Sequence, residues 1–147
     1  MAPDAGVKFT SMAKIAKAKG KKVGIVTTVS LDNDTNASFY ASQPSRNDYY
    51  EISLQAPQSG FDYFGGGGFK QMRGPKGDQK SVFDVFKEYG VQIANSREAF
   101  DQFQNGDELV LAVNHSPEPD DALPFNVDWE ANDDTVAEYV KLGMCLS

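Results

Sequence analysis

The sequence predicts an α/β fold: a mostly parallel sheet of about four strands with helices on both faces. Short runs of consecutive apolar residues alternate along the chain with stretches of helical periodicity. Strands that are apolar at successive positions are typical of parallel sheets, and their alternation with helices favours helical crossovers. The chain has 147 residues, of which 40% are hydrophobic, so we expect residues 1–147 to form a single domain with a substantial core.

The first predicted helix covers Thr10–Lys19. Helical spacing places Met12, Ile15 and Ala16 on one face, as in an amphipathic helix, and Gly20 follows as the C′ residue that ends it. Five basic residues occur in this helix and just after it: Lys14, Lys17, Lys19, Lys21 and Lys22. Because they follow helical spacing before a strand, we interpret them as a solvated helix face rather than a patch that tracks phosphates.

The strand signal is strongest over Val23–Val29, a run of β-branched residues that predicts a buried parallel strand. Asp32, Asn33 and Asp34 then offer N-cap oxygens for a helix over Thr35–Gln43. In chain order, the further predicted elements are a helix over Asn47–Leu54 that ends before Pro57, a strand over Phe61–Phe64, a helix over Ser81–Tyr89, a strand over Val91–Ala94, a helix over Arg97–Gln104, a strand over Glu108–Val113 and a helix over Asp133–Leu142.

The glycine run Gly65–Gly68 does not match a phosphate-binding loop. A P-loop needs Gly-Lys-Ser/Thr after four intervening residues, and the dinucleotide pattern needs a glycine where Lys70 stands. The run therefore predicts a backbone turn that requires positive φ.

Composition excludes several classes of function. A net charge of −7 and a pI of about 4.6 argue against nucleic-acid binding, which needs clustered positive charge. No apolar run approaches the roughly 18 residues of a membrane span, and the N-terminus lacks a signal-peptide pattern. Cys145 is the only cysteine, so it is interpreted as a buried structural thiol or an incidental one. His115 is the only histidine, which excludes a multi-histidine zinc site, and we expect it in a solvent-facing loop over 115–121.

Two groups of residues have chemistry suited to a site. Asp32, Asn33, Asp34 and Thr35 follow the first strand, where ligands of α/β sheets gather, and their oxygens suit Mg²⁺; the alternative is that they only cap the next helix. The guanidinium of Arg46 can bind two phosphate oxygens at once. The alternative role for Arg46 is that of a surface arginine, paired with Asp48 or Glu51.

Several segments resemble alkaline phosphatases in order and spacing. They are Gly24–Thr28, Asn33–Ala37, Tyr40–Ser42, Ser45–Asn47 and Gly65–Gly68. The resemblance extends from Ser11 to about Trp129 and corresponds to a central slice of these enzymes, so it implies a partial alkaline-phosphatase-like fold. Enzymes of the family hydrolyse phosphomonoesters with Zn²⁺ and Mg²⁺, usually in the periplasm or outside the cell.

The resemblance also implies roles for individual residues. Arg46 matches the arginine that binds the substrate phosphate, and Asn33 and Thr35 match positions that help to build the magnesium site. Asn33 stands where relatives carry an acid or a histidine, so we expect at most a weak Mg²⁺ site.

We expect no phosphatase activity from this chain alone. The family's serine nucleophile, in a motif of the Asp-Ser-Ala type, and its histidine-containing zinc motifs do not occur in the sequence. The chain is therefore interpreted as a fragment or remnant of an alkaline phosphatase. The alternative is a repurposed, non-catalytic α/β module for protein interaction or weak anion binding. Open sheet edges pair with other chains, so we also expect self-association.

Overall fold

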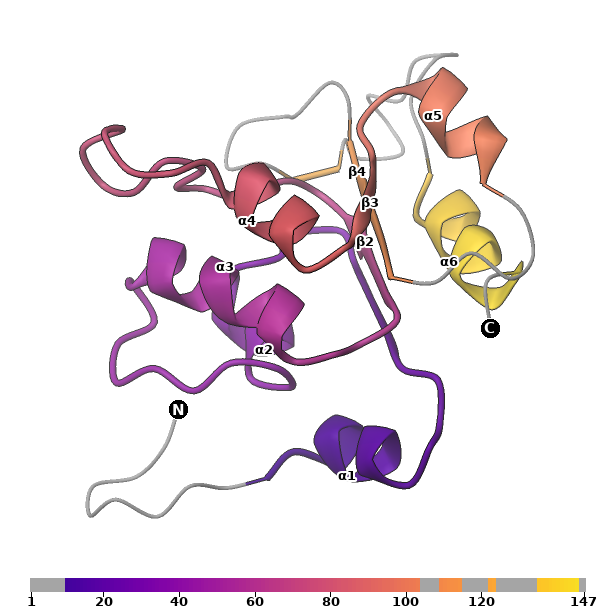
Figure 1. The fold of residues 1–147 in the computed structure, drawn as a ribbon, viewed down its shortest axis with the longest axis horizontal. Helices are drawn as coiled ribbons and strands as arrows, with labels where there is room; N and C mark the ends of the chain where they lie inside the picture. The colour runs from indigo at the N-terminus through magenta and orange to yellow at the C-terminus, as the bar shows by residue number, and fades with distance from the viewer. Residues whose placement is uncertain (1–9, 104–108, 115–121, 124–134, 146–147) are drawn as a thin grey trace.

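The computed structural model describes residues 10–103, 109–114, 122–123 and 135–145. Within them, a four-stranded parallel sheet of order β1-β2-β4-β3 lies between helices on both faces, which confirms the predicted fold class (Figure 1). The strands are β1 (Gly24–Thr27), β2 (Tyr63–Gly66), β3 (Gln92–Ala94) and β4 (Val110–Val113). The helices are α1 (Met12–Ala18), α2 (Asp34–Ala37), α3 (Tyr49–Gln58), α4 (Val82–Glu88), α5 (Arg97–Gln102) and α6 (Val136–Cys145).

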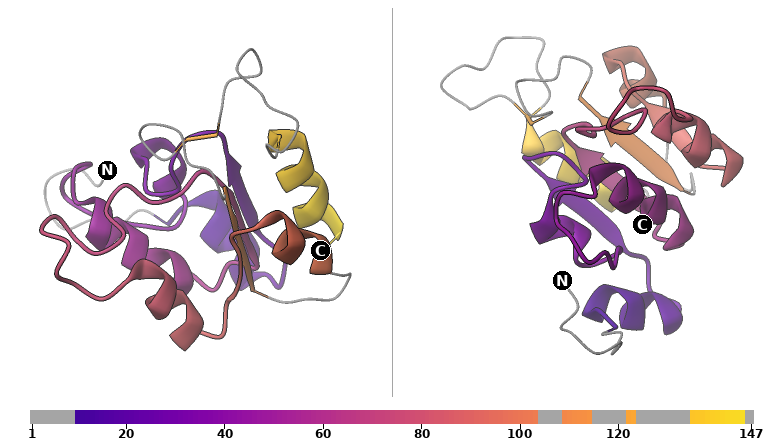
Figure 2. Two further views of the ribbon diagram at one scale, coloured as in Figure 1. Left: turned by 90° about the horizontal axis from the view of Figure 1, so that it is seen from above. Right: turned by 90° about the vertical axis from the view of Figure 1, so that its left-hand side faces the viewer.

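The order of the strands accounts for the two helical layers. The chain runs from β1 through β2 to β3 in one direction across the sheet, then returns to place β4 between β2 and β3. Because parallel crossovers are right-handed, helices on the outward path cover one face and the helix on the return path covers the other. Accordingly, α2, α3 and α4 lie on one side of the sheet and α5 and α6 on the other (Figures 1 and 2).

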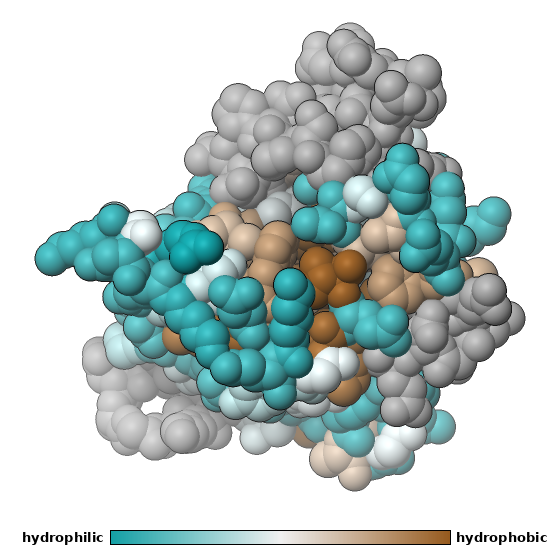
Figure 3. Space-filling view, turned by 45° about the horizontal axis from the view of Figure 1, so that its top comes forward, coloured by the Kyte–Doolittle hydropathy of each residue, from teal (hydrophilic) through white to brown (hydrophobic). Residues whose placement is uncertain are grey.

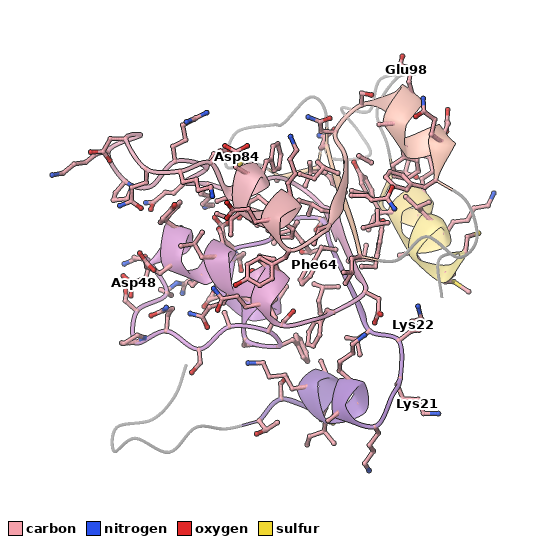
Figure 4. The ribbon with its side chains drawn as sticks, in the orientation of Figure 1. Lys21, Lys22, Asp48, Phe64, Asp84 and Glu98 are labelled. Carbon is pink, nitrogen blue, oxygen red and sulfur yellow. The ribbon has the colours of Figure 1, made fainter. Side chains whose placement is uncertain are left out.

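Aromatic rings form the core between the sheet and α2–α4. Phe64 of β2 lies at its centre (Figure 4). Its ring meets Tyr40 edge-on at 5.4 Å between centroids and Phe86 at 6.0 Å, and it stacks on Phe61 at 6.1 Å. Edge-to-face and offset pairs of this kind each stabilise a core by about 0.5–1.5 kcal/mol beyond area burial.

On the opposite face, Tyr63 connects the sheet to α6. Its hydroxyl donates a hydrogen bond to the carbonyl of Tyr139, 2.9 Å away. A Cβ on Gly65 would lie 2.5 Å from the Tyr63 hydroxyl, and a Cβ on Gly143 would lie 2.7 Å from its ring. The two glycines are therefore required by the close approach of this ring to β2 and α6.

Two predicted helices differ from the structure in extent. The helix expected over Thr35–Gln43 is the four-residue α2, followed by turns. The helix expected to end before Pro57 continues through it to Gln58. Proline removes one helical N–H, and in the last turn of α3 only one intrahelical bond is lost, so the helix tolerates it.

The apolar face predicted for α1 is not buried. Met12 is 79% exposed and Ile15 is 44% exposed. Instead, a polar contact anchors this helix: Lys17 Nζ donates to Asp62 Oδ1 at 2.6 Å. The prediction that the lysines form a solvated face is therefore wrong for Lys17, whereas Lys21 and Lys22 are exposed on the α1–β1 connection (Figure 4).

Asp62 joins α1 to the start of the sheet. Its Oδ1 accepts the hydrogen bond from Lys17 and lies 3.9 Å from Lys22 Nζ. Its Oδ2 accepts the backbone N–H of Val23 at 2.8 Å. Partial burial opposes the ionised form, but these hydrogen bonds and positive charges outweigh it, so the pKa of the Asp62 carboxyl is lowered from its ordinary 3.8.

The remaining sequence predictions concern the surface and the chain beyond the described parts. Cys145 is exposed in the last turn of α6, so the buried alternative was wrong. His115, the loop over 115–121 and Trp129 lie outside the described residues. Among the described helices, none is long and apolar enough to cross a membrane. The face in Figure 3 is largely hydrophilic, with a smaller hydrophobic patch near its centre.

Candidate functional site

The loop that leaves the carboxyl end of β1 is held rigidly from inside the protein. Leu31 is completely buried and donates its N–H to the carbonyl of Gly68 at 2.9 Å. Its own carbonyl accepts hydrogen bonds from the Tyr40 hydroxyl and from Asn36 Nδ2, both at 2.6 Å. The backbone that leads into α2 therefore has a fixed position relative to β2 and its glycine run.

Asp32 is a buried carboxylate in this loop, with no exposed surface. Its Oδ2 accepts the backbone N–H of Lys70 at 2.9 Å and the hydroxyl of Ser53 at 3.4 Å. Burial raises the pKa of the Tyr40 hydroxyl well above its usual 10.0, and the negative charge of Asp32 adds to the effect. Asp32 therefore connects the β1 loop with α3 and with the segment after the glycine run. The sequence suggested that Asp32 caps α2, but it does not.

Asn33 is the residue that caps α2. It has extended backbone geometry, and its Oδ1 accepts the N–H of Thr35 at 3.2 Å. Thr35 is exposed and Asn33 is half-buried. From the sequence, residues 32–35 were expected either to bind Mg²⁺ or to cap the next helix. Of these four residues, only Asn33 caps α2.

Asp34, the first residue of α2, pairs with Arg46. The distance between Arg46 Nη2 and Asp34 Oδ1 is 3.1 Å, and the two side chains are 59% and 31% exposed. Asp48 and Glu51, the partners considered from the sequence, form no salt bridge with Arg46 within the described chain. Arg46 and Asp34 are 12 residues apart across irregular structure, so no sequence periodicity could indicate this pair.

The structure thus brings Arg46 to Asp34, the residue between Asn33 and Thr35 at the start of α2. The donor set fits Mg²⁺ poorly. The Asn33 oxygen already accepts a helix N–H, and one Asp34 oxygen already faces a guanidinium. Over the described ranges, no group of three or more histidine, cysteine, aspartate or glutamate residues could hold a metal ion.

The glycine run forms part of the same edge of the sheet. Of the four glycines only Gly66 has positive φ, at +143°, so the predicted need for positive φ is confirmed there, but Gly66 is the last residue of β2 and the predicted turn is wrong. A Cβ at this position would lie 2.1 Å from the carbonyl oxygen of Thr27. The Gly66 carbonyl accepts the N–H of Asn114 after β4. Gly66 therefore lets three parallel strands end close together beside the site.

A sequence model of alkaline phosphatases matches residues 3–102, which is more than half of the chain. The chain belongs to the alkaline phosphatase family. A search of curated proteins finds no match. The fold is similar to that of the cold-active alkaline phosphatase from the psychrophile Shewanella sp., with a TM-score of 0.73, 23% identity and coverage of 93% of this chain and 31% of that one.

Two further members of the family have the same degree of structural similarity. The alkaline phosphatase from the Antarctic bacterium TAB5 has a TM-score of 0.73 and 24% identity, over 92% of this chain and 38% of that one. The enzyme from Thermus thermophilus has a TM-score of 0.73 and 28% identity, over 90% and 27%. A TAB5 variant was solved with Mg bound in its M3 site, so family members bind metals. The chain spans about a third of the length of these family members.

Proposed function

We propose that this chain binds phosphate or a phosphomonoester weakly through Arg46 and does not hydrolyse it alone. The observation that carries the proposal is the exposed guanidinium of Arg46, which pairs with Asp34, the residue between Asn33 and Thr35 at the start of α2. In open α/β sheets, ligands bind outside the carboxyl ends of the strands. The family assignment makes a phosphomonoester the expected anion.

The geometry of Arg46 supports weak binding. A guanidinium has five N–H donors, and only Nη2 contacts Asp34, so donors remain for two oxygens of a phosphate. A site with few charge-assisted bonds and one exposed cation is expected to have a dissociation constant on the order of millimolar. Mg²⁺ would use Asn33 and Thr35, and it should bind more weakly still, because neither residue brings a negative charge.

Hydrolysis is expected to need groups that this sequence does not contain. Phosphomonoester cleavage in this family depends on a serine nucleophile and on zinc held partly by histidines, and the sequence has one histidine. The framework of the chain would then contribute the phosphate-binding arginine, while other groups would supply the nucleophile and the metals.

A phosphate titration followed by NMR tests the proposal. Inorganic phosphate should shift the amide signals of residues 33–35 and 46 with millimolar affinity, and Arg46→Ala should weaken binding at least fivefold. Arg46→Lys, which keeps the charge but loses the fork, should give an intermediate affinity. With p-nitrophenyl phosphate, Zn²⁺ and Mg²⁺, the chain should show no turnover above buffer. Shifts that persist unchanged in Arg46→Ala, or metal-dependent turnover in a preparation free of host phosphatase, would contradict the proposal.

Self-association is a second candidate function, and the open edges of the sheet favour it. β1 and β3 are the edge strands of the described sheet. Beside β1, a groove of about 280 Å³ is lined mainly by apolar residues of β1, β2 and α6, among them Val26, Val140 and Met144. Met144 is 72% exposed and Val140 is 41% exposed. We infer that a second copy of the chain covers this edge, because the outer side of an edge strand beside an apolar groove is a template for strand pairing.

Sedimentation at increasing protein concentration measures this association. The chain should form dimers at high micromolar concentration, and Met144→Lys should shift the equilibrium toward monomer. Met12→Lys is the matched control, since Met12 is 79% exposed on α1, outside this groove. A clean monomer at high micromolar concentration, or equal effects of both substitutions, would argue against the β1 edge as an interface.

A further inference from the structure

The carboxylate of Asp34 occupies the guanidinium that the proposed function assigns to phosphate. We propose that Asp34 acts as an internal competitor, which lowers the affinity of Arg46 for anions and sets the threshold at which phosphate binds. This inference rests on the proposed function of Arg46. It gives Asp34 a role that the family resemblance did not assign. In this proposal Arg46 has two states, one paired with Asp34 and one released from it to bind phosphate.

The two side chains differ in how firmly the protein holds them. Asp34 is the first residue of α2, directly after the Asn33 cap, and its backbone carbonyl accepts the N–H of Ser38. Arg46 lies in the irregular connection between α2 and α3 and is 59% exposed. The carboxylate therefore has a fixed base, whereas the long arginine side chain can rotate toward solvent. An anion must either displace Asp34 from Nη2 or bind beside its negative charge.

Both routes weaken anion binding. Exposed ion pairs of this kind shift an equilibrium by a factor of about two to five, and displacement must overcome that factor. An anion that binds while the pair stays intact is repelled by a carboxylate a few ångströms away. Removing the charge of Asp34 should therefore tighten phosphate binding about three- to tenfold. The gain should shrink as salt is added, because salt screens exposed ion pairs.

The neighbouring acid Asp48 provides a matched control. It precedes α3, two residues after Arg46, and is only partly buried (Figure 4). Within the described residues it forms no salt bridge. Asp48→Asn removes the same unit of charge from the same neighbourhood, so it measures the general effect of net charge without releasing Arg46.

The experiment is a titration with inorganic phosphate at mildly alkaline pH and low salt, followed by NMR. It compares the unmodified chain with Asp34→Asn, Asp48→Asn, Arg46→Ala and the double variant Asp34→Asn/Arg46→Ala. Asp34→Asn should bind three- to tenfold more tightly, Asp48→Asn less than twofold, and the double variant should lose the gain. If Asp34→Asn does not fold, Asp34→Ser replaces it, since serine is also accepted in a first helical turn.

The outcomes separate this inference from the proposed function. If Arg46→Ala weakens binding but Asp34→Asn does not tighten it, Arg46 binds phosphate and Asp34 is not a competitor. If Asp34→Asn and Asp48→Asn tighten binding equally, the effect is one of net charge and the inference fails. If no variant binds phosphate, both the inference and the proposed function are wrong. A gain that survives in the double variant also overturns the inference, because the anion then binds elsewhere.

Discussion

Replacing Gly66 with alanine is expected to lower the free energy of unfolding by about 2–6 kcal/mol. The backbone there has φ of +143°, a region that is essentially restricted to glycine and costs other residues about 1–3 kcal/mol. The new Cβ would also lie 2.1 Å from the carbonyl oxygen of Thr27, so β1 and β2 would have to separate. Forcing atoms into packed structure costs about 1–3 kcal/mol more. Urea denaturation measures the change.

Gly77→Ala separates the two contributions. Gly77 also has positive φ, at +72°, but a Cβ there would meet nothing within 4 Å. This variant should lose only about 1–2 kcal/mol, the cost of the left-handed conformation. Gly66→Ala should in addition broaden or shift the amide signal of Asn114, whose N–H donates to the Gly66 carbonyl. Equal losses in both variants would mean that the contact with Thr27 relaxes freely.

Local sequence patterns predicted most of the secondary structure. The β-branched run before Thr28 predicted a strand, and β1 lies within it, but the predicted burial was wrong: only Ile25 of β1 is buried, because β1 is an edge strand of the described sheet. The helix predicted over Ser81–Tyr89 is α4 with its two cap residues, and Gly90 follows with φ of +76°. Periodicity and capping depend on residues close in sequence, so a single sequence contains this information.

The tertiary contacts of the site could not be predicted in the same way. Asp32, Asn33 and Asp34 are adjacent and similar in sequence, yet one is buried against Lys70, one caps α2 and one pairs with Arg46. Which side chain faces inward depends on how the loop is fixed by Gly68 and Tyr40, far away along the chain. The family resemblance singled out Arg46 as a candidate site residue, but it could not indicate that Arg46 pairs with Asp34.

Replacing Asp32 with alanine is expected to destabilise the fold by about 1–3 kcal/mol. The substitution removes the acceptor for the backbone N–H of Lys70, whereas the hydroxyl of Ser53 keeps its hydrogen bond to the carbonyl of Tyr49 at 2.8 Å. Each buried donor left without a partner costs about 1–3 kcal/mol. Because these bonds connect the β1 loop with α3 and with the segment after the glycine run, the amide signals of residues 31–35 and 68–70 should also change. Thermal or urea unfolding with NMR tests both effects.

Asp32→Asn distinguishes the hydrogen bonds from the negative charge. Asparagine keeps an oxygen for the Lys70 N–H and removes the buried charge, so its loss should be at least about 1 kcal/mol smaller than that of Asp32→Ala. The pKa of Tyr40 should fall only partly toward its usual value, because burial is the larger cause of its shift. Asp78→Ala, at an exposed aspartate, should change stability by no more than about 0.5 kcal/mol. If Asp32→Ala were as mild as Asp78→Ala, the buried carboxylate would have no structural role in the loop after β1.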